Sequence, residues 1–221
     1  LFTQVVDLGE GVAFYPQALL LGMVLYNLLA DSTGQAVRCI LNRENLVRRV
    51  DFPRLAVPAA TVLVAVFNFA LNLIVVLVFL LAAGGQVRWS WLQFIPLSLA
   101  LIALCMGLSM LLSMAFVKYR DVEPVWDVML TVLFYASAIF FPVQIITGED
   151  ADLIRRLLMF NPFAAILQQA RHAMIDPSHP SAAEAAGGAI WLLVPIGIGL
   201  AIIAWGAWVF RRGAPRVAEE L

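Results

Sequence analysis

The stretch AVPAATVLVAVFNFALNLIVVLVFLLAA, residues 56–83, contains no charged side chain. About 20 apolar residues are enough to cross the hydrocarbon core of a bilayer as a helix. In lipid every backbone polar group must pair internally, so a span is either a helix or a strand of a closed barrel. This stretch is too long for a barrel strand and lacks the alternation of apolar and polar residues that such a strand shows. It therefore predicts a transmembrane helix.

Four further stretches are also long and apolar enough to span: residues 12–30, 92–117, 124–146 and 189–210. The chain as a whole has 221 residues, of which 62% are hydrophobic and 13% are charged. Soluble domains are about 45–50% apolar and about 25% charged. The expected fold class is an all-α polytopic membrane protein, with residues 1–221 forming a single transmembrane domain.

Composition and motifs exclude several function classes. The net charge of −1 gives no field that would attract a nucleic acid. No glycine-rich phosphate loop and no nucleophile motif is present, and His172 and His179 lack partners with metal-ligand spacing. Cys39 and Cys105 do not make a disulfide framework. We therefore expect no catalytic residue, no metal site and no cofactor in this chain.

The distribution of basic residues predicts the orientation. Alternate connections carry ten Lys and Arg on one side of the membrane and four on the other. The positive-inside rule assigns the richer side to the cytoplasm. The sequence then begins outside, at Leu1, and ends in the cytoplasm. Five spans with an outside start imply that a sixth, N-terminal span precedes Leu1.

Two connections contain helices of their own. Residues 37–54 place apolar side chains at near-helical spacing with arginines between them. This amphipathic cytoplasmic segment is either an anchor on lipid headgroups or a docking element for a cytoplasmic partner.

The external connection, residues 147–188, is too long for a structureless loop. Residues 150–160 indicate a short helix, and Asn161-Pro162 indicates an N-cap and first-turn proline for a second helix over residues 162–174. That helix is too short to span, so we expect it in the outer interface or dipping part-way into the membrane. It is either a passive cap or an outer gate.

Polar side chains inside the predicted spans have two possible roles. Small and polar residues stabilise helix–helix packing by hydrogen bonding, and they also suit the wall of a conduit for a polar passenger. Packing is the favoured interpretation. The candidates are Tyr26, Asn68, Asn72, Ser109, Ser113, Tyr135 and Ser137.

Four motifs, in this order, resemble those of the permeases of type-2 ATP-binding-cassette exporters, and within that class the polysaccharide, O-antigen and teichoic-acid export permeases. LNRENLVRRVDFPR at 41–54 is similar to the family's cytoplasmic coupling helix, and KYRDV at 118–122 to its "YRDV" span end. YASAIFFP at 135–142 resembles its "SP…YP" span, although Ala138 replaces the usual proline. NPF at 161–163, followed by Arg171, resembles its "NP…R" external helix.

The resemblance implies specific roles for these residues. The ATPase-coupling residues would be Asn42, Arg43, Glu44, Leu46, Val47, Arg48, Arg49, Asp51, Phe52, Pro53 and Arg54. The cytoplasmic span-end motif would be Tyr119, Arg120 and Asp121, and the external gate would contain Asn161, Pro162, Phe163 and Arg171.

The resemblance also implies partners and a location. Two copies would pair in the bacterial cytoplasmic membrane, and each copy would seat one cytoplasmic ATPase subunit that binds ATP and Mg. The passenger would be a lipid-linked polysaccharide. The alternative within the class is a drug or lipid exporter. A membrane-embedded transferase would need clustered acids or histidines at one membrane face, and the sequence has none. A purely structural anchor would leave the external helices without a role.

Overall fold

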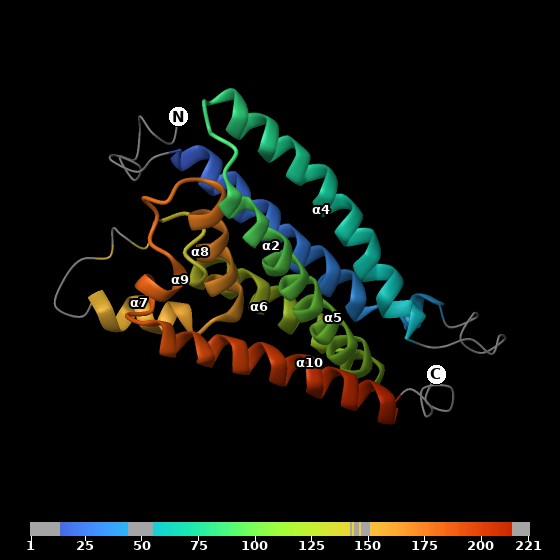
Figure 1. The fold of residues 1–221 in the computed structure, drawn as a ribbon. Coiled ribbons are helices and arrows are strands. Elements are labelled where there is room, and N and C mark those ends of the chain that lie inside the picture. Colours follow the sequence, from blue (N-terminus) through green and yellow to red (C-terminus); the bar gives the residue numbers. More distant parts are fainter. Residues whose placement is uncertain (1–13, 44–54, 142, 144–145, 147–150, 214–221) are drawn as a thin grey trace. The chain divides into compact units, whose positions relative to one another are not determined.

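The computed structural model describes residues 14–43, 55–141, 143, 146 and 151–213, and every regular element in these ranges is a helix (Figure 1). The long helices are α2 (Tyr15–Val37), α4 (Ala56–Ala82), α5 (Phe94–Lys118), α6 (Val122–Ala136) and α10 (Leu193–Gly213). The short helices are α7 (Ala151–Met159), α8 (Pro162–Met174) and α9 (Ala182–Ala185), with 3-10 turns at η1 (Leu41–Arg43), η2 (Trp89–Gln93) and η4 (Ala189–Leu192). The predicted all-helical class is confirmed.

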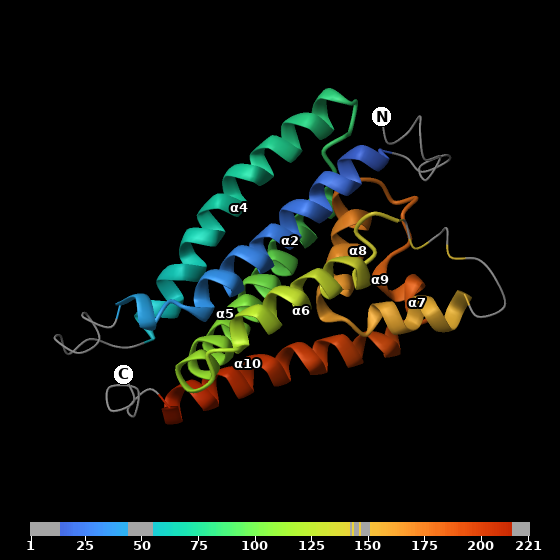
Figure 2. The same ribbon diagram turned by 180° about the vertical axis from the view of Figure 1, so that it is seen from behind.

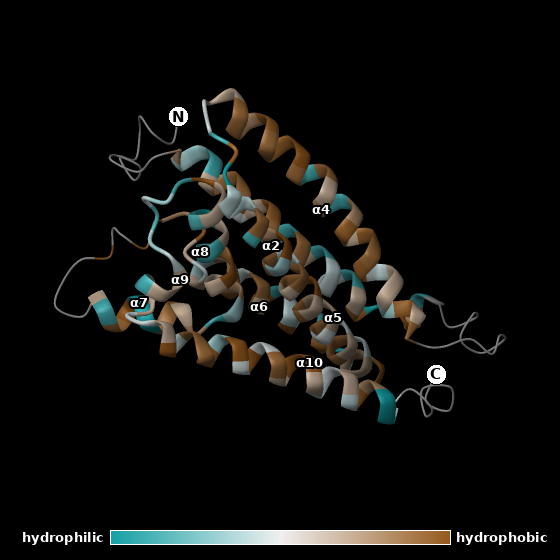
Figure 3. Cartoon of the chain, viewed as in Figure 1, coloured by the Kyte–Doolittle hydropathy of each residue, from teal (hydrophilic) through white to brown (hydrophobic). Residues whose placement is uncertain are grey.

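Three helical stretches of the described residues are long and apolar enough to cross a membrane: Ala56–Ala82, Trp89–Lys118 and Ala189–Gly213. Figure 3 shows α4 and α10 as hydrophobic along most of their length. Only 22% of the most apolar part of α4 and 11% of that of α10 is buried within the chain, as expected for helices that face lipid. Three of the five predicted spans therefore have the required length and composition, and the spans at 12–30 and 124–146 stay predictions.

The fourth predicted span is shorter as a helix than expected. Residues 124–146 were expected to form one continuous helix, but α6 ends at Ala136. Ser137 donates a hydrogen bond back to the Leu133 carbonyl at 2.5 Å, and Ala138 adopts a left-handed conformation with φ of 51°. That conformation terminates the helix. Helix α6 has 15 residues and is therefore about 22 Å long.

The first predicted span continues further than expected. Helix α2 runs to Val37 rather than to residue 30. It continues through Ser32 and Thr33 because both hydroxyls donate to the Leu29 carbonyl, at 3.2 and 2.6 Å. Trp126 donates its ring N–H to the Thr33 hydroxyl at 3.0 Å. These bonds satisfy the buried hydroxyls, so the polar stretch remains helical.

The chain divides into two compact units that share the long helices. Unit 1 comprises the described parts of residues 1–25, 71–99 and 133–198, and unit 2 comprises those of residues 26–70, 100–132 and 199–221. The prediction of a single transmembrane domain stays a prediction.

Unit 1 has α8 at its centre. Nine of the thirteen residues of α8 are buried, including Phe163, Leu167 and Arg171. Helices α7, α8 and α9 lie together in both views (Figures 1 and 2). An apolar cluster joins them, in which Met159, Ala164 and Ala185 are buried. The short helices between α6 and α10 therefore form a packed core of their own.

Unit 2 is built on close packing between α5 and α10 and on buried hydroxyls of α2 and α5. A Cβ on Gly206 would overlap the carbonyl oxygen of Gly107, so the two backbones touch. Ser109 of α5 donates to the Ser32 carbonyl of α2 at 3.2 Å, with both residues fully buried. Cys105 is likewise fully buried in this unit. Small and polar residues at helix contacts are typical of membrane proteins.

Candidate functional site

Asn161 starts α8 and ties it to the end of α6. Its side-chain oxygen accepts a hydrogen bond from the Phe163 N–H at 3.0 Å, and Pro162 occupies the first turn. This confirms the predicted N-cap and the predicted helix over residues 162–174. The side-chain nitrogen of Asn161 donates to the Ser137 hydroxyl at 3.0 Å. A single amide thus caps one helix and binds the residue that follows another.

Arg171 binds the same chain segment from the last turn of α8. Its terminal nitrogens donate to the carbonyl oxygens of Ala138 at 2.9 Å and Ile139 at 2.6 Å. These carbonyls follow the C-terminus of α6, where cations are favoured by the helix dipole. We call the set Ser137, Ala138, Ile139, Asn161 and Arg171 the α6–α8 junction.

The guanidinium of Arg171 is buried, with 4% of the residue exposed. Burial lowers the pKa of Arg171 to about 10, and the charge of nearby Tyr15 opposes this shift. Arg171 therefore remains protonated at neutral pH. Its Nε has no hydrogen-bond partner among the described residues. The two carbonyl bonds supply the direct polar contacts of a buried cation, which would otherwise be costly to desolvate.

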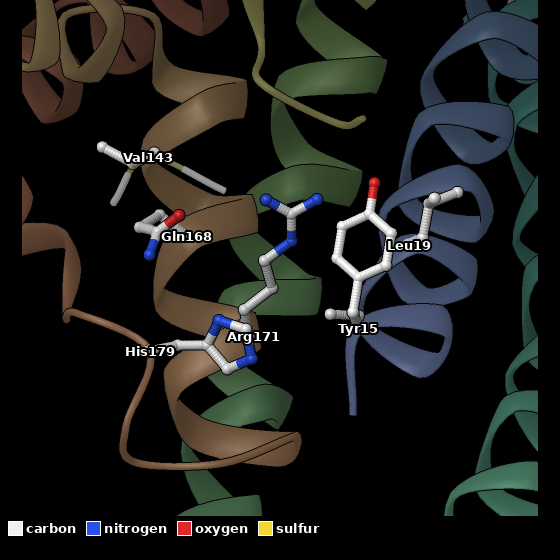
Figure 4. A pocket seen from close by; sticks show the side chains of 7 residues that line it. Tyr15, Leu19, Val143, Gln168, Arg171 and His179 are labelled. Atoms are coloured by element: carbon white, nitrogen blue, oxygen red, sulfur yellow. The ribbon is translucent and has the colours of Figure 1, made fainter. Parts of the chain in front are cut away.

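Helix α2 closes the third side of the junction. Tyr15 donates its hydroxyl to the Phe140 carbonyl at 2.5 Å. A Cβ on Gly22 would lie 3.3 Å from both an Arg171 terminal nitrogen and the Ile139 side chain, so glycine allows α2 this close approach. A cavity of about 10 Å³ remains between the helices (Figure 4), with Tyr15, Gln168, Arg171 and His179 in its lining. That volume is about enough for one water molecule.

Polar side chains of α8 hold it on its other faces. Gln168 donates to the Pro180 carbonyl at 2.7 Å, and His172 Nδ1 lies 2.7 Å from the His179 carbonyl oxygen. Gln169 donates to the Gln93 side chain at 3.2 Å and accepts from the Ala182 N–H at 3.1 Å. The helix is therefore fixed to the connections that precede α5 and α10.

Two acids outside the helical core form local turns. The Ser178 N–H donates to the Asp176 carboxylate at 2.8 Å, and this bond lowers the pKa of Asp176. The Ser181 N–H donates to the Glu184 carboxylate at 2.7 Å and the Glu184 N–H donates to the Ser181 hydroxyl, forming a capping box at the start of α9. The Ser181 bond lowers the pKa of Glu184. Helix α9 was not predicted, although Ser181 followed three residues later by Glu184 is the signal for such a cap.

Helix α7 has an unusual polarity for a surface helix. Arg155 donates to the carbonyls of Val143 and Ile146, and Arg156 donates to the Ala186 carbonyl. Arg156 also stacks on the Trp191 ring, with 4.5 Å between guanidinium carbon and ring centroid. The exposed side chains are Asp152 and the apolar Leu153, Ile154 and Leu157. The helix therefore turns its cations toward the protein and its apolar side chains outward.

The motifs expected on the cytoplasmic side lie only partly within the described residues. Asn42 and Arg43 belong to η1, whereas Glu44, Leu46, Val47, Arg48, Arg49, Asp51, Phe52, Pro53 and Arg54 lie outside the described ranges. Asn42 lines a cavity of about 260 Å³ together with Gln35, Arg38 and Thr61. Arg38 pairs with Glu123, at the start of α6. Tyr119, Arg120 and Asp121 are exposed between α5 and α6. This end of unit 2 is open and polar.

The conduit candidates separate into two groups. Ser109, Ser113 and Ser137 are buried and donate to backbone carbonyls, and Tyr26 donates to the Leu130 carbonyl at 3.0 Å. Ser109 and Tyr26 donate to carbonyls of other helices, as helix–helix packing requires, whereas Ser113 and Ser137 donate to carbonyls one turn earlier in α5 and α6. Asn68, Asn72 and Tyr135 are exposed within the chain.

Sequence analysis missed several residues that build the junction. Tyr15 and Gly22 were not singled out, because a lone tyrosine or glycine in an apolar span has no local signal. Ala138 was noted only as a departure from a motif. A spacing of 33 residues separates it from Arg171, and nothing in either segment indicates the pairing.

The fold and its apolar helices define a multi-pass membrane protein. The family model for the ABC-2 type transporter matches residues 1–175, and the chain belongs to this family. It is similar to the O-antigen export system permease protein RfbA of Myxococcus xanthus, with 26% identity over 167 residues, or 76% of this chain and 63% of the relative. Two such permease proteins of Klebsiella pneumoniae are 22% and 23% identical over 163 and 154 residues.

These matches confirm the resemblance drawn from the motifs. The Klebsiella matches cover 73% and 69% of this chain and 61% and 58% of the relatives. The chain thus spans less than two thirds of the length of the curated relatives that it matches.

Proposed function

We propose that this chain is the transmembrane half-channel of an ATP-driven exporter that moves a lipid-linked polysaccharide out across the cytoplasmic membrane. Its similarity to O-antigen export permeases carries the proposal. Two copies pair to enclose the path, and ATP hydrolysis takes place on a separate ATPase subunit. The chain itself performs transport rather than a chemical reaction. It begins on the outer side and ends in the cytoplasm.

In this proposal the segment 37–54 couples the ATPase to the spans. The described start of that segment supports the role. Asn42 lines the open 260 Å³ cavity, and the neighbouring Arg38 pairs with Glu123 at the start of α6. This ion pair would therefore transmit a displacement of the segment directly to α6. The exposed Tyr119 and Arg120 complete the polar surface available to a partner.

Helix α6 is the best candidate for the wall of the path. Asp127 and Thr131 are exposed and lie four residues apart, hence on one face of the helix. A carboxylate facing lipid is costly, so this face suits water or a polar passenger. Tyr135, further along α6, is 63% exposed and offers an aromatic surface for stacking on sugar rings.

The external helices form the outer gate in this proposal. The α6–α8 junction supports it, because α8 holds the end of α6 at two separate points. A disulfide between cysteines replacing Ser137 and Asn161, whose side chains are 3.0 Å apart, would fix α8 to α6. We expect export to stop in the oxidised double variant and to recover with dithiothreitol. Unimpaired export after complete oxidation would contradict a gate that opens at this junction.

The passenger distinguishes the proposal from its alternative, a drug or lipid exporter of the same class. The complex with its ATPase should be purified in mild detergent and the extracted lipids analysed by mass spectrometry. A pyrophosphate-linked glycan supports polysaccharide export. A small amphiphile in its place supports the alternative. Deletion of the gene should also cause the lipid-linked glycan to accumulate on the cytoplasmic side, and normal surface glycan after deletion would refute the proposal.

A further inference from the structure

Helices α5 and α10 run parallel in unit 2 and share one end. Near the middle of α5, a Cβ on Gly107 would lie 2.8 Å from the Ile203 Cα, and a Cβ on Gly206 would overlap the Gly107 carbonyl. Seven residues further along α5, a Cβ on Gly213 would overlap the Met114 side chain. Both helices advance in the same direction between these contacts. Their C-termini are therefore neighbours.

Both C-termini carry cations. Lys118 lies in the last turn of α5, and Arg211 and Arg212 lie in the last turn of α10. We call these three residues the basic end cluster. All three are exposed, and none takes part in an ion pair within the described ranges. Asp121 is the acid nearest to Lys118 along the described chain, and the adjacent Arg120 offsets its charge. The cluster therefore has cations available for an external anion.

Trp208, which lies beside this cluster, is a residue type that is typical of the depth of lipid headgroups. The Arg212 guanidinium carbon lies 4.2 Å from the centroid of the Trp208 ring, which is half exposed. Trp205, one turn earlier, is 61% exposed. Figure 3 shows α10 as hydrophobic along its length and hydrophilic in its last turn. Tryptophan is enriched at the membrane–water interface, and arginine next to it extends its charge toward the headgroups.

We propose that the basic end cluster is a binding site for the phosphate headgroup of an anionic phospholipid, such as phosphatidylglycerol. The glycine contact sets the C-terminal ends of α5 and α10 side by side, so cations of both helices lie at the same end of unit 2. Lys118 supplies a point charge, and the two arginines supply planar donors that suit phosphate. The apolar, lipid-facing surface of α10 continues directly into the cluster, so the acyl chains have a surface to lie on. In the predicted orientation the headgroup belongs to the cytoplasmic leaflet.

The test compares phosphatidylglycerol with phosphatidylcholine bound to the full chain. Native mass spectrometry from nanodiscs of each lipid would count retained lipids, and a titration would give the affinity ratio. We expect tighter binding of phosphatidylglycerol. The variant Arg211→Gln/Arg212→Gln should lower the ratio about 25-fold, since each cation near an anionic surface contributes roughly a factor of five.

Three variants separate a headgroup site from general attraction. Arg88→Gln removes an exposed cation from unit 1 and should leave the ratio unchanged. Arg211→Lys/Arg212→Lys keeps the charge but loses the planar donors, and should lower the ratio less than the glutamine variant. Trp208→Leu should lower it because the ring no longer holds Arg212. An unchanged ratio in the double glutamine variant, or an equal loss in Arg88→Gln, would overturn the proposal.

Discussion

The terminal nitrogen of Arg171 lies 2.9 Å from the carbonyl oxygen of Ala138, which is 33 residues earlier and holds a left-handed φ of 51°. The bond joins the last turn of one helix to the residue that terminates another. A non-glycine residue in this conformation costs on the order of 1 kcal/mol. The surrounding contacts offset this cost, and Arg171 supplies two of them. Helix α6 is consequently held short by a residue from a distant helix.

Replacing Arg171 by leucine should therefore destabilise the protein strongly. Two buried carbonyls would lose their donor, at about 1–3 kcal/mol each. Arg171→Lys keeps the charge but cannot reach both carbonyls with a planar fork, so it should give an intermediate loss. Thermal unfolding of the detergent-solubilised protein would measure both. Arg88→Leu, at an exposed side chain, is the matched control and should change the midpoint little. Equal stability of wild type and Arg171→Leu would contradict the role of the junction.

The side-chain oxygen and the side-chain nitrogen of Asn161 should contribute separately to the stability of the protein. Asn161→Asp keeps the oxygen that caps α8 but loses the donor to Ser137, whereas Asn161→Ala loses both. An N-cap contributes about 1 kcal/mol, so alanine should cost more than aspartate. The double variant Asn161→Asp/Ser137→Ala should cost less than the sum of the single changes. Denaturant unfolding of the wild type, Asn161→Asp, Ser137→Ala and the double variant measures this coupling. Strict additivity of the changes in unfolding free energy would mean that the bond between the two side chains contributes nothing.

The glycines of α10 should respond oppositely to alanine. A Cβ on Gly206 would overlap the Gly107 carbonyl, so Gly206→Ala forces α5 and α10 apart. A Cβ on Gly197 meets nothing within 4 Å. Gly197→Ala should therefore stabilise the helix by up to about 1 kcal/mol, since alanine is the better helix former. Unfolding midpoints should fall for Gly206→Ala and stay equal or rise for Gly197→Ala. A similar response at both positions would mean that the close helix contact is absent.

The start of α9 should loosen in acid. The pKa of Glu184 is lowered from the usual 4.5, so its stabilising bond to Ser181 is fully present above pH 4.5 and is lost as the pH falls through the lowered value. Asp176, whose pKa is lowered from 3.8, acts in the same direction. The protection factors of residues 182–186, which are hydrogen-exchange rates corrected for the intrinsic rate at each pH, should fall below pH 4.5. In Glu184→Gln the protection factors should no longer depend on pH in this range. Wild-type protection factors that stay constant in acid would contradict the prediction.

The coupling segment can be tested by charge reversal. Arg48→Glu with Arg49→Glu should abolish copurification with the ATPase subunit, because the arginines are expected to meet acids on that partner. Membrane insertion should be unchanged, as judged by membrane fractionation. Arg211→Glu with Arg212→Glu reverses the same number of charges in the last turn of α10 and should leave copurification intact. Retained association in the Arg48/Arg49 variant would refute the docking role.

Local signals allowed parts of this fold to be predicted from sequence. Asn161-Pro162 marked the start of α8 correctly because capping depends on neighbouring residues only. The end of α6 was placed ten residues too late, since the run of apolar residues continues through Ile139 and Phe140. The turn there depends on Arg171, which no window around α6 contains. The extension of α2 was missed for the same reason, because Thr33 is satisfied partly by Trp126.

The candidate site follows the same rule. Asn161, Pro162, Phe163 and Arg171 were identified from a family motif, and the structure brings Asn161 and Arg171 together at the end of α6. Ala138 and Ile139, which are the partners of Arg171, carry no sequence signal, because a backbone carbonyl as acceptor leaves no trace in the choice of side chain. Long-range contacts to the backbone are therefore the part of such a site that sequence reasoning misses.

The contact between Gly107 and Gly206 also constrains how this chain can evolve. Both positions already carry the smallest residue, so no compensating change at one can make room for a larger residue at the other. Every larger residue at either position pushes α5 and α10 apart. This separation would also move the cations at the ends of the two helices apart. A substitution in the middle of the helices would therefore lower the charge density of the basic end cluster as well.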